Sequence, residues 1–346
     1  MEIKDFSKLN IEPLIAPQPK EPRDESRLMV VNRKTSNIEH RIFKEITEYL
    51  SPGDCIVINE SKVWKAKLKA KKTTGGAVEL LLVSKEDENG CIWKALCRKI
   101  KINQELLLPE DIKARCVDRK EDGSYIFELS QNINLDYLNR NAFVPLPSYI
   151  EKKRKKENID LNMEQDLNRY QTVYANEIGS IAAPTAGFHF TRDLLNKIEE
   201  KGIKIAKVTL HVGWGTFKPV RTNPENHIML PEFCSISERS AEIINESKRN
   251  NKKIISVGTS STRTLEKMSD ESGFVKSGSL WADIFIYPGY RFKAPDMFIT
   301  NFHLPDSPPI YMTAAFCGID LLYKAYNIAV ENKYRFYSYG DAMLII

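Results

Sequence analysis

Three histidines follow short apolar runs at places where the chain is rich in small and hydroxyl-bearing residues. His189 ends the sequence IAAPTAGFH, His211 ends KIAKVTLH and His303 ends MFITNFH. Imidazole exchanges protons near neutral pH, and glycine lets the backbone approach a ligand closely. Each histidine alone could be a buried structural residue. Because all three lie at expected strand ends, we predict that they share one pocket and transfer protons there.

A fourth loop carries groups that suit an anion. In the sequence IISVGTSSTRTLE, an apolar run turns at Gly258 into a hydroxyl-rich segment that includes Arg263. Ligands of open α/β sheets bind at the carboxyl ends of strands, beside the N-terminus of the following helix. Free amides, hydroxyls and a guanidinium therefore predict a phosphate or carboxylate site, although an ordinary helix cap uses the same residues. The GxxxxGK[ST] order of a P-loop is absent.

Hydrolytic chemistries find little support in the sequence. It contains no HExxH or HxH motif and no carboxylate at ligand spacing from the histidines, which argues against a metal hydrolase. It also lacks the GxSxG turn of a serine hydrolase. The six cysteines form no CxxC pair, so we expect neither a disulfide nor a structural metal.

Two kinds of periodicity divide the chain. Between residues 61 and 151, short alternating runs separated by turns are typical of a small β-barrel. Elsewhere, apolar runs alternate with helical spacing, as over 38–50, 237–250 and 312–332, which indicates a sheet covered by helices. We predict an α/β protein: a large discontinuous α/β domain (1–60 and 152–346) with an inserted β-barrel domain (61–151).

The composition is that of a globular protein with a sizeable core. Of 346 residues, 42% are hydrophobic and 28% are charged, and the formal net charge is +5. The longest apolar runs fall far short of the ~20 residues of a membrane helix, and the N-terminal sequence lacks the features of a secretory signal. We therefore expect a cytoplasmic protein with no membrane segment.

Basic residues gather in two segments. WKAKLKAKK alternates with a period of two, which predicts a strand with its lysines on one face, and EKKRKKE follows at 151–157. Because phosphate neutralisation is local, such clusters favour RNA or another polyanion as a partner, with a solvated basic face as the alternative. The side chains expected to contact RNA are Lys65, Lys67, Lys69, Lys71, Lys153 and Arg154.

Several long segments, spread essentially from end to end, resemble one family. They include LIAPQPKEPRDESRLMV, RYQTVYA, GSIAAPTAGFHF, VTLHVGWGTFKPVR, VGTSSTRTLE, ITNFHLPDS and YRFYSYGDAMLI. These segments closely resemble the S-adenosylmethionine:tRNA ribosyltransferase-isomerase family of queuosine biosynthesis. The resemblance implies a transferase that moves the ribosyl unit of S-adenosylmethionine to 7-aminomethyl-7-deazaguanine at the wobble position of tRNA. The ribose is isomerised, the product is epoxyqueuosine, and adenine and methionine are released.

The implied reaction sets expectations for partners and residues. S-adenosylmethionine is a consumed co-substrate, no cofactor or metal is needed, the tRNA binds through its anticodon stem-loop, and the family suggests a monomer. A base must remove a proton from the carbon beside the sulfonium, and an acid must donate a proton to the departing adenine. We expect His189, His211 and His303 to play these roles. The residues expected to bind S-adenosylmethionine are Pro184, Thr185, Ala186, Gly187, Gly213, Gly215, Thr216, Thr259, Ser260 and Arg263.

One departure from the family pattern lies near these motifs. Leu230 stands where the family typically carries a histidine in the pattern HxMHxE, between His227 and Glu232. An RNA-binding relative that has lost turnover is therefore the alternative to an enzyme. Because the other motifs are intact, we favour the enzyme, and release of adenine from S-adenosylmethionine distinguishes the two.

Overall fold

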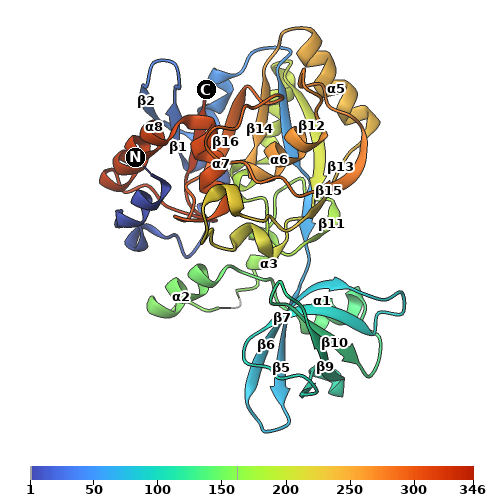
Figure 1. Ribbon diagram of the computed structural model, residues 1–346. Coiled ribbons are helices and arrows are strands. Elements are labelled where there is room, and N and C mark those ends of the chain that lie inside the picture. Colours follow the sequence, from blue (N-terminus) through green and yellow to red (C-terminus); the bar gives the residue numbers. More distant parts are fainter. Residues whose placement is uncertain (1, 162) are drawn as a thin grey trace. The chain divides into compact units, whose positions relative to one another are not determined.

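The chain divides into two compact units. The computed structural model describes residues 2–161 and 163–346 (Figure 1). Contacts group residues 1–62 with 147–346 in the larger unit, and residues 63–146 form the smaller one. No helix within these described residues is long and apolar enough to cross a membrane.

A nine-stranded sheet, counted over the described residues, forms the centre of the larger unit, in the order β15-β13-β12-β3-β14-β16-β17-β1-β2. In chain order its strands are β1 (Arg27–Val31), β2 (Ile38–Ile42), β3 (Cys55–Asn59), β12 (Lys204–Leu210), β13 (Glu232–Ile236), β14 (Ile254–Val257), β15 (Gly278–Ala282), β16 (Met297–Asn301) and β17 (Ala342–Ile345). Strands β12, β3, β14 and β16 are mutually parallel. Their carboxyl ends therefore meet at one edge of the sheet. Two short strands, β4 (Ser61–Val63) and β11 (Glu177–Ser180), pair separately.

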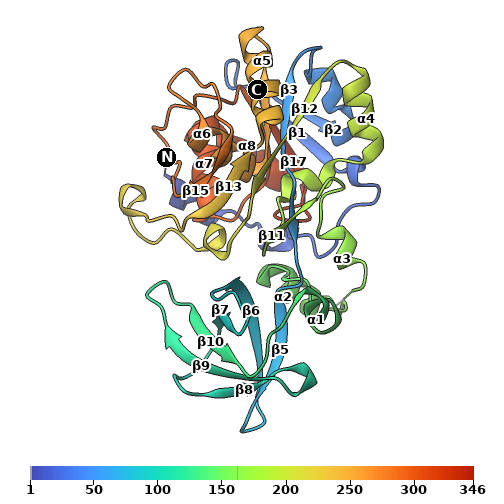
Figure 2. The ribbon, with the colours of Figure 1, turned by 90° about the vertical axis from the view of Figure 1, so that its right-hand side faces the viewer.

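Helices cover both faces of this sheet, as Figures 1 and 2 show. Ile56 and Ile58 of β3 pack in the same cluster as Leu194 of α4 (Arg192–Glu200). The alternate residue Val57 packs on the other side, with Ile244 of α5 (Glu238–Arg249) and residues of α6 (Gly258–Met268). Two further helices, α7 (Pro308–Cys317) and α8 (Ile319–Glu331), pack with the N-terminal segment. Burial of both faces explains why the central strands read as continuous apolar runs.

The predicted α/β class is confirmed, and two local predictions are corrected. Residues 38–50, predicted to be one helix, form edge strand β2 followed by a short 3₁₀ helix (Phe43–Tyr49), because Ile38–Ile42 pairs antiparallel with β1. The helix predicted over 312–332 is two helices, which are separated by Gly318 with φ 89°. By contrast, α5 begins directly after Ser237, whose side chain accepts the backbone N–H of Ser240 as an N-cap.

The smaller unit is the predicted β-barrel, closed in the order β10-β7-β6-β5-β8-β9 (Figure 2). Its strands are β5 (Lys67–Lys72), β6 (Ala77–Lys85), β7 (Ile92–Cys97), β8 (Glu105–Leu107), β9 (Lys113–Arg119) and β10 (Tyr125–Leu129), and α1 (Leu135–Asn141) follows them. Strand β5 alternates as expected, with Leu68 and Ala70 in the barrel core and Lys69 and Lys71 exposed.

Helix α2 (Ser148–Lys156) and the four-residue α3 (Asp166–Arg169) belong to the larger unit. Of the predicted barrel domain 61–151, residues 61–62 lie in the larger unit, and so do residues 147–151. For residues 147–151 the reason is Arg154, whose side chain is fully buried and donates two hydrogen bonds, 2.6 and 2.8 Å long, to Asp166. It also donates to the carbonyl of Pro17. The prediction that Arg154 contacts RNA is wrong, because a buried guanidinium satisfied in this way is not available to a phosphate.

Replacing Arg154 by methionine tests this structural role. Removal of one partner leaves the Asp166 carboxylate buried and uncompensated, which costs about 3–5 kcal/mol of unfolding free energy. Lys155→Met, one residue away on the same helix and exposed, is the matched control and leaves stability nearly unchanged. Urea unfolding of both variants decides the point, and equal stabilities would contradict the assignment.

Candidate active site

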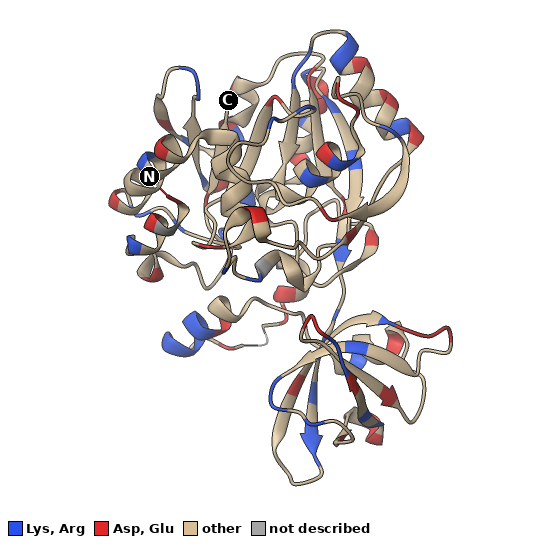
Figure 3. Cartoon of the chain, viewed as in Figure 1, with Lys and Arg blue, Asp and Glu red and all other residues tan. Residues whose placement is uncertain are grey.

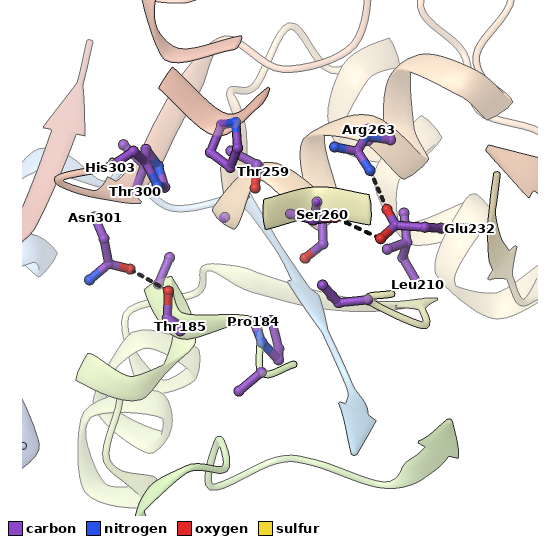
Figure 4. A pocket seen from close by; sticks show the side chains of 16 residues that line it. Pro184, Thr185, Leu210, Glu232, Thr259, Ser260, Arg263, Thr300, Asn301 and His303 are labelled. Atoms are coloured by element: carbon purple, nitrogen blue, oxygen red, sulfur yellow. Dashed lines mark hydrogen bonds and ion pairs between the residues drawn. The ribbon is translucent and has the colours of Figure 1, made fainter. Parts of the chain in front are cut away.

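A pocket lies at the carboxyl ends of the parallel strands (Figure 4). Its walls come from the segment before the 3₁₀ helix Thr185–His189, the ends of β12 and β16, the beginning of β13, and the first turn of α6. Residues from five parts of the chain therefore converge here. The predicted site residues that line it are Pro184, Thr185, Ala186, Thr216, Thr259, Ser260, Arg263 and His303.

The three predicted glycines lie behind the wall of this pocket. A Cβ on Gly187 would lie 2.0 Å from the Tyr174 hydroxyl, and one on Gly215 would lie 2.9 Å from Cβ of Leu230. The backbone N–H of Gly213 donates to Glu232 Oε1 over 2.8 Å. Gly187 and Gly215 permit close packing, and none of the three glycines is among the residues that line the cavity. Leu230 packs against Gly215.

A buried ion pair forms one side of the pocket. Glu232 and Arg263 are each 3% exposed and form an ion pair, drawn in Figure 4. The same carboxylate also accepts the Thr216 hydroxyl over 2.6 Å. Nε of Arg263 is buried and has no hydrogen-bond partner among the described residues. Nothing in the sequence marks Glu232 as a site residue, because a lone glutamate at the start of a strand gives no signal of its distant partner.

Asn301 forms the opposite side and connects the pocket to His189. The Thr185 hydroxyl donates to Asn301 Oδ1 over 3.0 Å, and Asn301 Nδ2 lies 3.2 Å from His189 Nε2. An amide N–H at Nε2 implies that the proton resides on Nδ1, which lies 2.6 Å from Ser26 Oγ. His189 is 4% exposed. Burial, followed by the charges of Arg335 and Arg23, lowers its pKa to about 3. His189 is thus a neutral, fully bonded histidine behind the wall.

His303 alone among the three histidines lines the pocket. Its Nε2 lies 2.6 Å from the Thr300 hydroxyl, and its backbone N–H donates to the Tyr326 hydroxyl over 2.7 Å. Nδ1 makes no hydrogen bond to any described residue, which leaves this nitrogen to a ligand. Burial lowers the pKa of His303, so the ring is neutral at pH 7.

His211 belongs to a different cavity. Leu210 and Val212 face the pocket, so the alternation along the chain turns His211 away from it. Its ring stacks on Phe233 with centroids 5.5 Å apart, and a Cβ on Gly179 would lie 2.5 Å from it. The cavity beside it, about 590 Å³, is also lined by Glu60 and Lys207. Burial lowers the pKa of His211. The prediction that the three histidines share one pocket is therefore wrong.

The predicted RNA-binding lysines differ in whether their ammonium groups already have a partner in the protein. Figure 3 shows basic residues on the barrel strands and on α2. Lys69 and Lys71 are exposed, with Lys69 Nζ 4.4 Å from the ring centroid of Phe143. The other lysines have partners within their own units, as follows: Lys65 donates to the Asn139 carbonyl, Lys67 pairs with Glu79 at 2.9 Å, and Lys153 pairs with Glu157 at 3.2 Å.

Together, the fold and the pocket define the class of protein. A pocket at the carboxyl ends of parallel strands, with an apolar wall and a few converging polar groups, is typical of an α/β enzyme that acts on a small molecule. Over residues 4–345 the chain matches the family described as queuosine biosynthesis protein, and it belongs to that family.

Similar proteins cover the whole chain. Relatives named S-adenosylmethionine:tRNA ribosyltransferase-isomerase include that of Caldanaerobacter subterraneus, 47% identical over 342 residues and 97% of each chain. That of Clostridium kluyveri is 46% identical over 352 residues and all of both chains. The crystal structure of S-adenosylmethionine tRNA ribosyltransferase from Thermotoga maritima matches with a TM-score of 0.53, 37% identity and 98% coverage of both chains.

The state of His189 predicts a pH dependence of stability. The unfolded imidazole takes up a proton near its ordinary pKa of 6.5, whereas the folded one stays neutral down to about 3. Its contribution is therefore complete above pH 6.5 and is lost as the pH falls, by about 1.4 kcal/mol per pH unit. We expect His189→Asn to flatten the fall in unfolding free energy between pH 6 and pH 4.

Urea unfolding at several pH values measures this slope. His227→Asn is the matched control. Burial and then the charge of Lys218 lower the pKa of His227 as well, but its ring is only partly buried, so this variant flattens the slope much less than His189→Asn does. Parallel curves for His189→Asn and the wild type would show that His189 is protonated in the folded state.

Proposed function

We propose that this chain transfers the ribosyl unit of S-adenosylmethionine to 7-aminomethyl-7-deazaguanine at the wobble position of tRNA and isomerises it. The products are epoxyqueuosine in tRNA, adenine and methionine. The end-to-end match to the family over residues 4–345 carries this proposal. S-adenosylmethionine is a consumed co-substrate, no further cofactor takes part, and the protein acts as a cytoplasmic monomer on the anticodon stem-loop.

S-adenosylmethionine binds in the pocket at the strand ends. Ala183, Pro184 and Ala186 supply a small apolar wall against which adenine can lie flat. The methionine end is a zwitterion, and Arg263 with Glu232 presents one charge of each sign to it. The unpaired Nε of Arg263 and the first turn of α6, with Thr259 and Ser260, add donors for the carboxylate.

The cavity in this state is about 50 Å³, whereas small-molecule sites usually span about 300–1,000 Å³. Entry of S-adenosylmethionine therefore requires that the loops lining the pocket move apart. Closure around the ligand then excludes water, which protects the reactive intermediates.

The chemistry needs proton transfer and no enzyme nucleophile. The sulfonium acidifies the C5′ hydrogens; a base removes one, and the electrons expel adenine. The neutral aminomethyl group then attacks, and methionine leaves as the epoxide closes. His303 is the histidine that reaches this pocket, and its Nδ1 makes no hydrogen bond to a described residue. Burial lowers its pKa to about 3 in this state. Opening of the pocket to admit the ligand relieves that burial, so that Nδ1 can then accept a proton. His189 acts as a positioning residue, because it holds Asn301 and so Thr185.

The first test is a single-turnover reaction with tRNA that carries the aminomethyl-deazaguanine. Stoichiometric free adenine together with an epoxyqueuosine mass supports the proposal and shows that Leu230 is tolerated. The control reaction uses tRNA with an ordinary guanine and releases no adenine. Tight binding of the modified tRNA without adenine would identify an RNA-binding relative without turnover.

The assignment of His303 predicts a loss in the chemical step. We expect His303→Gln to lower the single-turnover rate at least about 10²-fold, the smaller end of what a general acid or base contributes. His211→Ala changes a ring of similar type in the other cavity, and its rate stays within a few-fold of the wild type. The reverse pattern, with His211→Ala inactive and His303→Gln active, would place the reaction in the other cavity.

The exposed barrel lysines predict a salt-dependent contact with tRNA. Replacing both Lys69 and Lys71 by alanine removes two phosphate contacts, so tRNA binding weakens and the slope of log K against log salt falls by about 2. The matched control replaces Lys113 and Lys120, which already have carboxylate partners. If both double variants show the same slope, the face that carries Lys69 and Lys71 does not contact the tRNA.

A further inference from the structure

A second pocket lies in the larger unit; its cavity is small in this state, about 10 Å³, and basic residues surround it. Four parts of the chain form it: residues 19–26, Arg169, residues 188–189 and residues 335–340. Four of its lining residues carry a positive charge: Lys20, Arg23, Arg169 and Arg335. No Asp or Glu is among the described residues that line it. The residues 19–26, Arg169 and 335–340 belong to motifs that the proposed reaction chemistry does not use.

The charges of this pocket are only partly balanced. Arg169 pairs with Glu21 at 2.9 Å, and Arg335 pairs with the buried Asp341 at 3.3 Å. Arg23 has no carboxylate within ion-pair distance in the described parts of the chain. Its guanidinium donates to the backbone carbonyls of Gln171, Asn168 and Phe188, over 2.8, 2.9 and 3.4 Å. These carbonyls satisfy the hydrogen bonds of Arg23 but leave its positive charge without a neutralising anion.

Two further observations indicate that an acceptor is missing. Nε of Arg169 is shielded from solvent and has no hydrogen-bond partner among the described residues, which is unfavourable for a buried donor. Burial and the neighbouring charge of Arg169 lower the pKa of Arg23 to about 10. An anion between these guanidiniums would relieve both.

The basic pocket and the candidate active site share one wall. His189 lines the basic pocket, and its Nε2 lies 3.2 Å from Asn301 Nδ2. Asn301 in turn lines the active-site pocket and accepts the Thr185 hydroxyl. One imidazole and one amide therefore separate the two pockets.

We propose that the basic pocket binds a phosphodiester of the tRNA that flanks the reacting nucleotide. This inference rests on the proposed function. Guanidiniums bind phosphate oxygens through charge-assisted, often paired hydrogen bonds. An enzyme that acts on a base takes it out of its stack, and phosphate contacts then fix its position without reading sequence. A phosphate held beside His189 keeps the nucleotide near a base that enters the active-site pocket.

The test measures binding of an anticodon stem-loop RNA in the absence of S-adenosylmethionine, so that no turnover is needed. Lys20→Ala removes an exposed cation whose side chain makes no ion pair with a described residue. Lys34→Ala, in the exposed turn after β1, is the matched control. We expect Lys20→Ala to weaken binding and to lower the salt slope by about 1, with no change for Lys34→Ala. Equal behaviour of the two variants would overturn the proposal.

Single neutral methylphosphonates in the RNA identify the phosphate. At one of the two positions that flank the reacting nucleotide, the substitution should weaken binding to the wild type and have little further effect on Lys20→Ala, because both changes remove one contact. If every methylphosphonate costs the same in both proteins, the pocket does not hold a flanking phosphate. Adenine release by the wild type, measured separately, shows whether the proposed function stands when this inference fails.

Inorganic phosphate separates an RNA site from a site for the free anion. If the pocket binds an RNA phosphate, inorganic phosphate displaces the stem-loop from the wild type at constant ionic strength. It displaces the stem-loop less effectively from Lys20→Ala. The contrary result is that phosphate raises the melting temperature of the wild type but not of Lys20→Ala, while Lys20→Ala binds RNA as tightly as Lys34→Ala does. That result would make the pocket a free-phosphate site and overturn the RNA assignment.

Discussion

The side chain of Asn59 joins the strand ends on which the candidate site is built. It is fully buried at the end of β3, where Nδ2 donates to the Leu210 carbonyl and to Ser260 Oγ, over 2.9 and 3.0 Å. Its Oδ1 accepts the backbone N–H groups of Leu210 and Ser61, each over 3.0 Å. The side-chain amide of Asn59 thus connects the end of β3 by hydrogen bonds to the end of β12 and to the first turn of α6. Because a half-satisfied buried amide is costly, this arrangement fixes the strand ends relative to one another.

Around this fixed edge, polar groups are satisfied in two separate networks. In the first network, the Glu232 carboxylate accepts hydrogen bonds from Gly213 and Thr216 and pairs with Arg263. In the second, the Asn301 amide connects Thr185 with His189. Each network holds one wall of the pocket, and the hydroxyls and amides between them are left for a ligand. The buried histidines are neutral, so the charges that face the ligand come chiefly from the Glu232–Arg263 pair. Such a site suits a zwitterionic co-substrate with a flat apolar ring.

The sequence predicts the fold class, the barrel and the location of the pocket, because periodicity and strand-end motifs are local signals. It does not show on which face a residue lies at a strand end: Leu210 and Val212 face the pocket, and His211 between them does not. Long-range partners are equally invisible. Nothing in the basic run around Arg154 indicates burial against Asp166 and Pro17. The basic pocket joins residues 19–26 and 335–340 to Arg169 and His189 in the middle of the chain, and the sequence alone gives no reason to bring them together.

A crystal structure of the protein with S-adenosylmethionine bound, without tRNA, tests the central claim most directly. We predict that adenine lies against the wall formed by Ala183, Pro184 and Ala186, with the methionine carboxylate within hydrogen-bond distance of Arg263. We also predict that the pocket has enlarged from its present volume of about 50 Å³ and has closed around the ligand. Density for S-adenosylmethionine in the cavity beside His211 and Phe233, with the strand-end pocket unchanged, would contradict it.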